Sequence, residues 1–225
     1  MAKASEVKRK GMLRIMAKLT FRYSAMNAGK STMAMQVAHN YGEIGANILV
    51  WKPLIDTKGE DTITSRIGIN RKVDHLLSDT DSPVILIKEV LKTTPNIDAI
   101  IVDEAQFLTE NQVNELYYIT KIFDIAVLCF GLRCDFQMQG FVGAPRLLLL
   151  ADDIEEIKTL CSCKKKATQN LRLVNGKPTF EGEQVAIDGT EDITYKSVCG
   201  ECFIKFYLEW MENKEQPLIK ERKKG

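Results

Sequence analysis

The chain has 225 residues, and 45% of them are hydrophobic, which is enough for one substantial core and a small appended module. Its 31 basic and 30 acidic residues leave a net charge of only +1, which argues against the broad positive field of a nucleic-acid binder. No apolar run approaches the roughly 20 residues that cross a bilayer, and the charged N-terminus lacks the pattern of a secretory signal. We therefore expect a cytoplasmic protein with neither a membrane nor a nucleic-acid partner.

Expected strands and helices alternate through the first two thirds of the chain. Apolar runs predict strands at 18–25 and 46–53, with a helix at 30–43 between them. The polar stretch 56–82 has weak periodicity and predicts a long loop. Further along, we expect a helix at 84–93, a strand at 98–107, a helix capped by Thr109 with Gln112 three residues on, a strand at 125–133 and a helix from Ala144. This order predicts an α/β fold with a mainly parallel sheet flanked by helices.

The character of the sequence changes near residues 151–160, where cysteines and short extended runs replace the helical patterns. A last helix is expected at roughly 200–214, with an apolar stripe that suits packing better than ligand binding. We therefore predict four regions. They are a flexible leader at 1–16, an α/β domain at 17–155, a small cysteine-rich domain at 156–215 and a basic tail at 216–225.

The segment 24–31, with the sequence SAMNAGKS, has the features of a phosphate-binding loop between a strand and a helix. Backbone N–H groups at a helix N-terminus bind phosphate, and the helix dipole adds positive potential. Gly29 permits close approach of the backbone, Lys30 would reach the β- and γ-phosphates, and Ser31 would bind Mg²⁺. Ser24 replaces the first glycine of the usual motif, which is tolerable if its φ is negative. Because the strand–loop–helix context is present, we predict a P-loop nucleotide-binding domain.

Two acids, Asp103 and Glu104, follow a buried strand. Ligands of open α/β sheets bind at the carboxyl ends of the strands. Asp103 suits the organisation of Mg²⁺, and Glu104 is then available to take a proton from an attacking hydroxyl. The alternative is a pair of solvated carboxylates at a strand end.

The cysteine-rich region offers four thiols in two close pairs, Cys161 with Cys163 and Cys199 with Cys202. Four sulfurs fit a tetrahedral structural Zn²⁺, and a disulfide framework is not expected in a cytosolic chain of this size. Buried free thiols are the alternative interpretation. The remaining cysteines, Cys129 and Cys134, suit packing.

The motifs SAMNAGKS, VDEAQF, FGLRCDFQ, EGEQVAIDG and YKSVC, over residues 18–205, resemble in order and spacing the zinc-containing thymidine kinases of bacteria and the animal cytosol, the type II family. The resemblance implies transfer of the γ-phosphate of ATP to the 5′-hydroxyl of thymidine, giving dTMP and ADP for nucleotide salvage and DNA precursor synthesis. It implies ATP, Mg²⁺ and a structural Zn²⁺ as cofactors. It also implies a homotetramer that is inhibited by dTTP.

The resemblance also implies roles for individual residues. Glu104 corresponds to the general base, while Ser31 and Asp103 correspond to the magnesium residues. The implied ATP-binding residues are Ser24, Ala25, Met26, Asn27, Ala28, Gly29, Lys30, Ser31, Asp103 and Gln106. The implied thymidine-binding residues, several of them in a loop that covers the base, are Met26, Asp56, Phe107, Leu132, Phe136, Phe141, Gln184, Val185, Ala186, Ile187, Asp188 and Tyr195.

The chain departs from the family pattern at two of these places. IDG (187–189) stands where the family usually has IGG, and Lys58 stands where the family has an arginine near the ribose. Lysine lacks the bidentate fork of arginine. Arg66 is a further candidate for contact with phosphate oxygens.

Two other functions are compatible with parts of this pattern. A different P-loop ATPase with a zinc module would act on nucleic acid, but it would need an extended basic surface. A catalytically silent nucleotide binder would not need the complete set of Lys30, Ser31, Asp103 and Glu104. A kinase is therefore the leading hypothesis.

Overall fold

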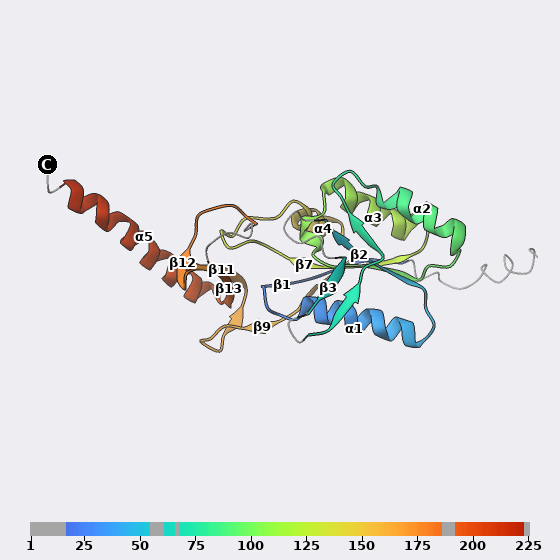
Figure 1. The fold of residues 1–225 in the computed structure, drawn as a ribbon, viewed down its shortest axis with the longest axis horizontal. Helices are drawn as coiled ribbons and strands as arrows, with labels where there is room; N and C mark the ends of the chain where they lie inside the picture. Colours follow the sequence, from blue (N-terminus) through green and yellow to red (C-terminus); the bar gives the residue numbers. More distant parts are fainter. Residues whose placement is uncertain (1–16, 55–60, 66–67, 186–191, 223–225) are drawn as a thin grey trace, which may run out of the picture.

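The computed structural model in Figure 1 describes residues 17–54, 61–65, 68–185 and 192–222. Side chains are described as far as Lys214. The predictions for the leader 1–16 and for Asp56, Lys58, Arg66, Ala186, Ile187 and Asp188 lie outside the described residues.

A fully parallel six-stranded sheet forms the centre of the larger domain. In spatial order its strands are β5 (His75–Leu77), β2 (Ile48–Pro53), β6 (Ala99–Val102), β7 (Ala126–Leu132), β1 (Leu19–Ser24) and β8 (Asp153–Glu156). Every residue of β6 is buried, because helices cover both faces of the sheet. The predicted fold class is confirmed.

Helix α1 (Lys30–Glu43) covers one face of the sheet, and α2 (Pro83–Thr93), α3 (Glu110–Ile122) and α4 (Gly143–Leu150) cover the other (Figure 1). Neighbouring strand residues serve opposite faces, as the pleat requires. In β2, Val50 packs in the cluster under α1, and Trp51 packs in the cluster on the opposite face. Thr109 caps α3 through the predicted capping box with Gln112.

The expectation of a long loop at 56–82 is wrong for part of that range. It contains a hairpin of β3 (Thr62–Thr64) and β4 (Asn70–Lys72), and then β5, which extends the main sheet. Asp74, which directly precedes β5, holds this strand beside β2, since its carboxylate accepts a hydrogen bond from Val50 N at 2.7 Å. Strands of three residues are too short to show a period of two, so their sequence carries no strand signal.

The expected strand at 98–107 ends earlier, at Val102. A short 3₁₀ turn, η2 (Ala105–Phe107), follows the two acids. The last helix is longer than expected, since α5 extends over Gly200–Arg222 and includes most of the predicted tail. Among the side chains that the structure describes, the apolar stripe ends at Trp210, and hydrophobic periodicity gave no signal for the charged turns beyond it.

The small domain packs against the carboxyl ends of the central strands (Figure 1). Its three-stranded antiparallel sheet has the order β12 (Lys177–Thr179), β11 (Gln169–Val174), β13 (Ile193–Val198), and β9 (Thr159–Leu160) pairs with β10 (Lys166–Ala167). Phe180 at the centre of its core contacts the rings of Phe203, Tyr207 and Trp210 of α5, at centroid distances of 5.2, 5.2 and 5.5 Å. The aromatic stripe of α5 is therefore a packing surface, as predicted.

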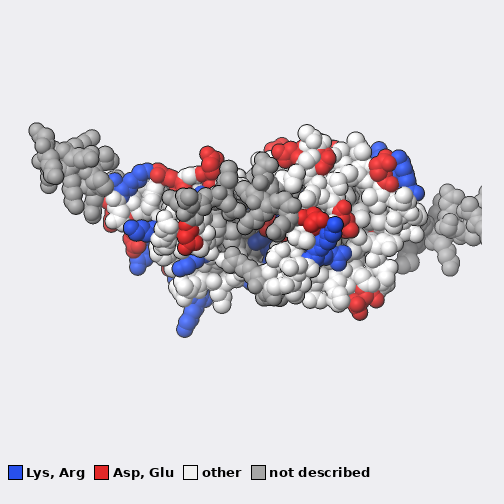
Figure 2. All heavy atoms as spheres, in the orientation of Figure 1, with Lys and Arg blue, Asp and Glu red and all other residues white. Residues whose placement is uncertain are grey.

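Positive and negative side chains are intermixed on the face in Figure 2, where the described residues form no continuous basic surface. Among the described helices, none is long and apolar enough to cross a membrane.

Candidate active site

The segment 24–31 connects the end of β1 to the start of α1, which is the predicted position of a phosphate loop. Gly29 adopts φ 81°, a left-handed conformation that favours glycine, and Asn27 adopts φ 62°, which asparagine tolerates. Ser24 is the last residue of β1, so its backbone is extended and its φ is negative. The serine is therefore compatible with an intact loop.

The Lys30 side chain is buried and lies against the loop that it serves. Its Nζ donates to Ser24 Oγ at 3.1 Å and to the carbonyl oxygen of Ala25 at 3.2 Å. Ser24 Oγ in turn donates to Ala25 O at 2.6 Å. The ammonium group is thus positioned at the N-terminus of α1, where its charge adds to the dipole of the helix.

Asp103 and Glu104 lie directly after β6, at the same edge of the sheet as the loop. Asp103 is 2% exposed, and its Oδ1 is buried with no hydrogen-bond partner among the described residues. Burial raises the pKa of Asp103 to about 7, the negative charge of Glu104 adds to the rise, and a hydrogen bond with Ser31 opposes it. A buried carboxylate oxygen without a partner, beside a serine hydroxyl, fits a hard cation such as Mg²⁺.

Glu104 has φ 52°, a left-handed conformation that is costly for a residue with a long side chain. Its Oε2 accepts a hydrogen bond from Gln106 Nε2 at 2.6 Å. The other end of the Gln106 amide accepts from Leu132 N at 3.0 Å. Gly131 leaves room for this contact, because a Cβ there would lie 2.8 Å from Gln106 Oε1. A strained backbone and a fixed carboxylate are typical of a functional site.

The predicted nucleoside residues gather around the loop 133–142, which follows β7. Phe107 and Phe141 pack edge to face with centroids 5.2 Å apart, and Phe136 is 1% exposed. Leu132 ends β7 beside Gln106. The structure brings Phe107, Leu132 and Phe141 together in one cluster, against which Met26 also packs, while Phe136 lies in the same loop as Phe141. Contact of these side chains with thymidine stays a prediction.

Gln184 and Tyr195 lie at the two ends of the predicted base-covering loop, and both are connected to the rest of the site. Gln184 Nε2 donates to Asp135 Oδ2 at 2.7 Å, and its carbonyl oxygen accepts from Arg172 at 3.1 Å. The Tyr195 hydroxyl accepts from Arg172 Nε at 2.9 Å. Val185, the last residue described on the Gln184 side of this loop, is half-buried.

Three residues that the sequence analysis did not select, Asp135, Asn170 and Arg172, are almost fully buried here. The Arg172 guanidinium lies over the Phe136 ring, with Cζ 3.6 Å from the centroid. A signal was present in β11, whose sequence QNLRLV places Asn170 and Arg172 on one face and leucines on the other. Polar residues on a strand face that is itself buried indicate a site.

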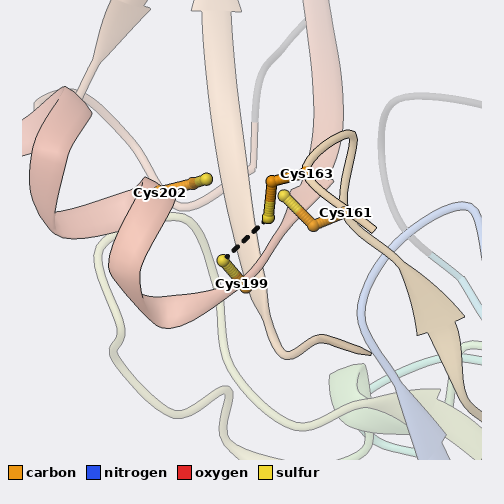
Figure 3. Close-up of side chains that lie close together, drawn as sticks. All are labelled: Cys161, Cys163, Cys199 and Cys202. Atoms are coloured by element: carbon orange, nitrogen blue, oxygen red, sulfur yellow. Dashed lines mark hydrogen bonds between the residues drawn. The ribbon is translucent and has the colours of Figure 1, made fainter. Parts of the chain in front are cut away.

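The four predicted cysteines lie together at the N-terminal end of α5. Figure 3 shows the side chains of Cys161, Cys163, Cys199 and Cys202 pointing toward one another. Their sulfur atoms all lie within 4.8 Å of one another, and ligands at Zn–S distances of about 2.3 Å would be about 3.8 Å apart. Backbone hydrogen bonds from Cys163 and then Cys199 lower the pKa of Cys161 to about 6, whereas a hydrogen bond with Cys163 raises the pKa of Cys202 to about 12. Without a metal ion, the cluster thus favours one thiolate surrounded by thiols. All six cysteines are free, so the cluster fits a tetrahedral metal ion.

The fold and the site define a P-loop nucleotide-binding protein with an acidic strand end and a cysteine-rich module. Comparison with known proteins makes this specific, since the family model described as Thymidine kinase matches residues 17–203. The chain belongs to the thymidine kinase family.

Curated relatives match over most of their length. A thymidine kinase of Coxiella burnetii is 45% identical over 190 residues, which cover 84% of this chain and 95% of the relative. One from Shewanella oneidensis is 45% identical over 193 residues, with 85% and 98% covered. One from Streptococcus gordonii is 42% identical, with 84% and 97% covered.

Proposed function

We propose that this protein is an ATP-dependent thymidine kinase that transfers the γ-phosphate of ATP to the 5′-hydroxyl of thymidine. The observation that carries the proposal is the meeting of the phosphate loop, Asp103 and Glu104 at one edge of the sheet, in a chain of this family. A new bond forms between the 5′-oxygen and the γ-phosphorus, the bond from that phosphorus to the bridging oxygen breaks, and Glu104 takes the hydroxyl proton. ADP and dTMP are the products.

The residues contribute mainly position and charge, as phosphoryl transfer requires. The loop 24–31 would bind the phosphates through backbone N–H groups and Lys30. Ser31 and Asp103 would hold Mg²⁺, which neutralises phosphate charge when bound. Gln106 holds Glu104 in place, since its side-chain amide donates to the Glu104 carboxylate and accepts from Leu132 N.

This function predicts that ATP consumption rises when thymidine is added and does not rise when single-stranded DNA is added. A coupled assay for ADP measures both. Stimulation by single-stranded DNA alone would favour the alternative P-loop ATPase, and ATP binding without turnover in any mixture would indicate a silent binder.

Among nucleosides, thymidine should be preferred over deoxycytidine by roughly 10²–10⁴-fold in kcat/KM. The family resemblance implies that main-chain groups in 184–195 bind the base, and main-chain donors cannot reorient for cytosine. Two mismatched buried groups at about 1–3 kcal/mol each account for this preference. Deoxyuridine, which lacks only the 5-methyl group, should remain a fair substrate, whereas deoxyguanosine should be too large. Competition among the four nucleosides tests the order, and comparable rates for deoxycytidine would contradict it.

The second proposal concerns zinc, for which the cysteine cluster supplies a complete set of ligands. We expect one Zn²⁺ per chain, bound by Cys161, Cys163, Cys199 and Cys202. It would join the segment between β9 and β10 to the start of α5 and so stabilise the small domain. Its role is structural, since all four positions would be occupied by sulfur.

Elemental analysis of protein purified without added zinc should find this ion. Cys161→Ser and Cys202→Ser should each lose the ion. Their melting temperatures should fall by roughly 2–4 °C for every kcal/mol of unfolding free energy that is lost, as expected for a chain of this size. Cys134→Ser, outside the cluster, is the matched control and should retain the metal. Unchanged metal content and melting temperature in both cluster variants would refute the site.

We further propose, from the family resemblance, a cytoplasmic homotetramer that is inhibited by dTTP. An inhibitor of this kind would present the thymine ring to the nucleoside site and its phosphates to the loop 24–31.

A further inference from the structure

The side chain of Asn170, in β11, lies between the two halves of the active site. Its Oδ1 accepts a hydrogen bond from Met26 N, in the phosphate loop, at 2.7 Å. Its Nδ2 donates to the carbonyl oxygen of Cys134, in the loop 133–142, at 2.7 Å. Asn170 is 1% exposed, so both contacts are shielded from water. One amide therefore joins the loop that would bind phosphate to the loop that carries Phe136.

The small domain contacts the same part of the phosphate loop at two other points. Ser197 Oγ, in β13, donates to the carbonyl oxygen of Met26. Asn27 Nδ2 donates to the carbonyl oxygen of Tyr195 at 3.0 Å. Together with the bond from Met26 N to Asn170, these bonds involve the N–H and the carbonyl group of Met26 and the side chain of Asn27. The conformation of residues 26–27 is thus determined jointly by the two domains.

Asn170 pairs two main-chain groups, the N–H of Met26 and the carbonyl oxygen of Cys134, and an apolar side chain of the same size would leave both without this partner. An amide suits this position because it carries one acceptor and one donor group on a single rigid plane. The leucines on the other face of β11, Leu171 and Leu173, serve packing in the small-domain core. With both bonds made, a shift of either loop displaces a bonded group on the other.

We propose that Asn170 is a positioning residue that couples occupancy of the nucleotide site to occupancy of the nucleoside site. The inference rests on the proposed function, because it takes thymidine as the ligand beside the loop 133–142. Binding at one loop restricts the other through the shared amide, so each ligand raises the affinity for the other by the same factor.

The experiment is calorimetric titration of the full-length chain with thymidine, in the absence and the presence of saturating MgADP. The ratio of the two dissociation constants is the coupling factor, which we expect to be about 5 or more in the unmodified chain. Asn170→Asp keeps an acceptor for Met26 N but places a second carboxylate oxygen against Cys134 O. It should bind MgADP within about threefold of the unmodified chain, while the coupling factor falls to near one.

Gln169→Leu is the matched control. Gln169 is the preceding residue of β11, and its side chain accepts a hydrogen bond from the Cys134 thiol; among the described residues it makes none with a main-chain group of either loop. Its coupling factor should equal that of the unmodified chain. Melting temperature and zinc content report whether each variant is folded, and Asn170→Ala, which loses both bonds without adding charge, is a second variant if Asn170→Asp is unstable.

A coupling factor of one in the unmodified chain would overturn the inference. So would an unchanged factor in the Asn170 variants, or an equal fall in Gln169→Leu. Absence of thymidine binding by the unmodified chain would contradict the proposed function itself, and it is seen before any variant is made.

Discussion

Replacing Glu104 with glutamine is expected to lower kcat by about 10²–10⁴-fold, the usual contribution of a general base. Glutamine keeps the size of the side chain and can still bond with Gln106, so the site should keep its shape. What it loses is the ability to take the proton of the 5′-hydroxyl. Affinities for ATP and thymidine should change little, and steady-state kinetics with titrations of both ligands would separate the two effects.

The matched control is Glu110→Gln, at an exposed glutamate in the first turn of α3, away from the acidic strand end. Its kcat should equal that of the unmodified enzyme. A Glu104→Gln enzyme with near-normal kcat would remove Glu104 from the mechanism, and the unusual backbone at φ 52° would then need another explanation.

The second large effect is expected at Lys30. Lys30→Ala removes the positive charge that would contact the β- and γ-phosphates, and turnover should fall by about 10³-fold or more. Lys30→Met keeps the apolar stem in the buried position and should show the same loss, which separates the charge from the packing. Initial rates at saturating ATP and thymidine measure both variants.

Ser24→Gly is the control within the same loop. The hydroxyl accepts from Lys30 Nζ at 3.1 Å and donates to Ala25 O at 2.6 Å, at the end of β1 where the usual motif has glycine. Glycine loses both bonds, but Lys30 Nζ and Ala25 O still bond to each other, so neither group is left without a partner. We therefore expect ATP affinity within about tenfold of normal. A Ser24→Gly enzyme as inactive as Lys30→Ala would assign the serine a direct catalytic role.

Much of the larger domain could be predicted from the sequence because its signals are local. The helix at 30–43 has the predicted ends, and the capping box at Thr109 is present as expected. The hairpin in 62–72 and the edge strand at His75 could not be predicted, because their stability comes from pairing with distant segments rather than from a pattern of their own.

The candidate site also contains residues that could be predicted from the sequence and residues that could not. Lys30, Asp103 and the four cysteines lie in short motifs whose spacing already implies their neighbours. Asn170 belongs to the site only because β11 lies beside the phosphate loop, and its partner Met26 is 144 positions away. Hydrogen bonds across that distance depend on tertiary structure, so a single sequence shows at most an unusual polar residue in an apolar strand.

The contacts of the phosphate loop also have a consequence for synthesis on the ribosome. Met26 and Asn27 depend on partners 144, 168 and 171 positions later in the chain. All six strands of the parallel sheet precede these partners in the chain, so the sheet can pair while the loop still lacks all three bonds. A nascent chain should therefore gain its mature nucleotide affinity only after β13 has left the exit tunnel.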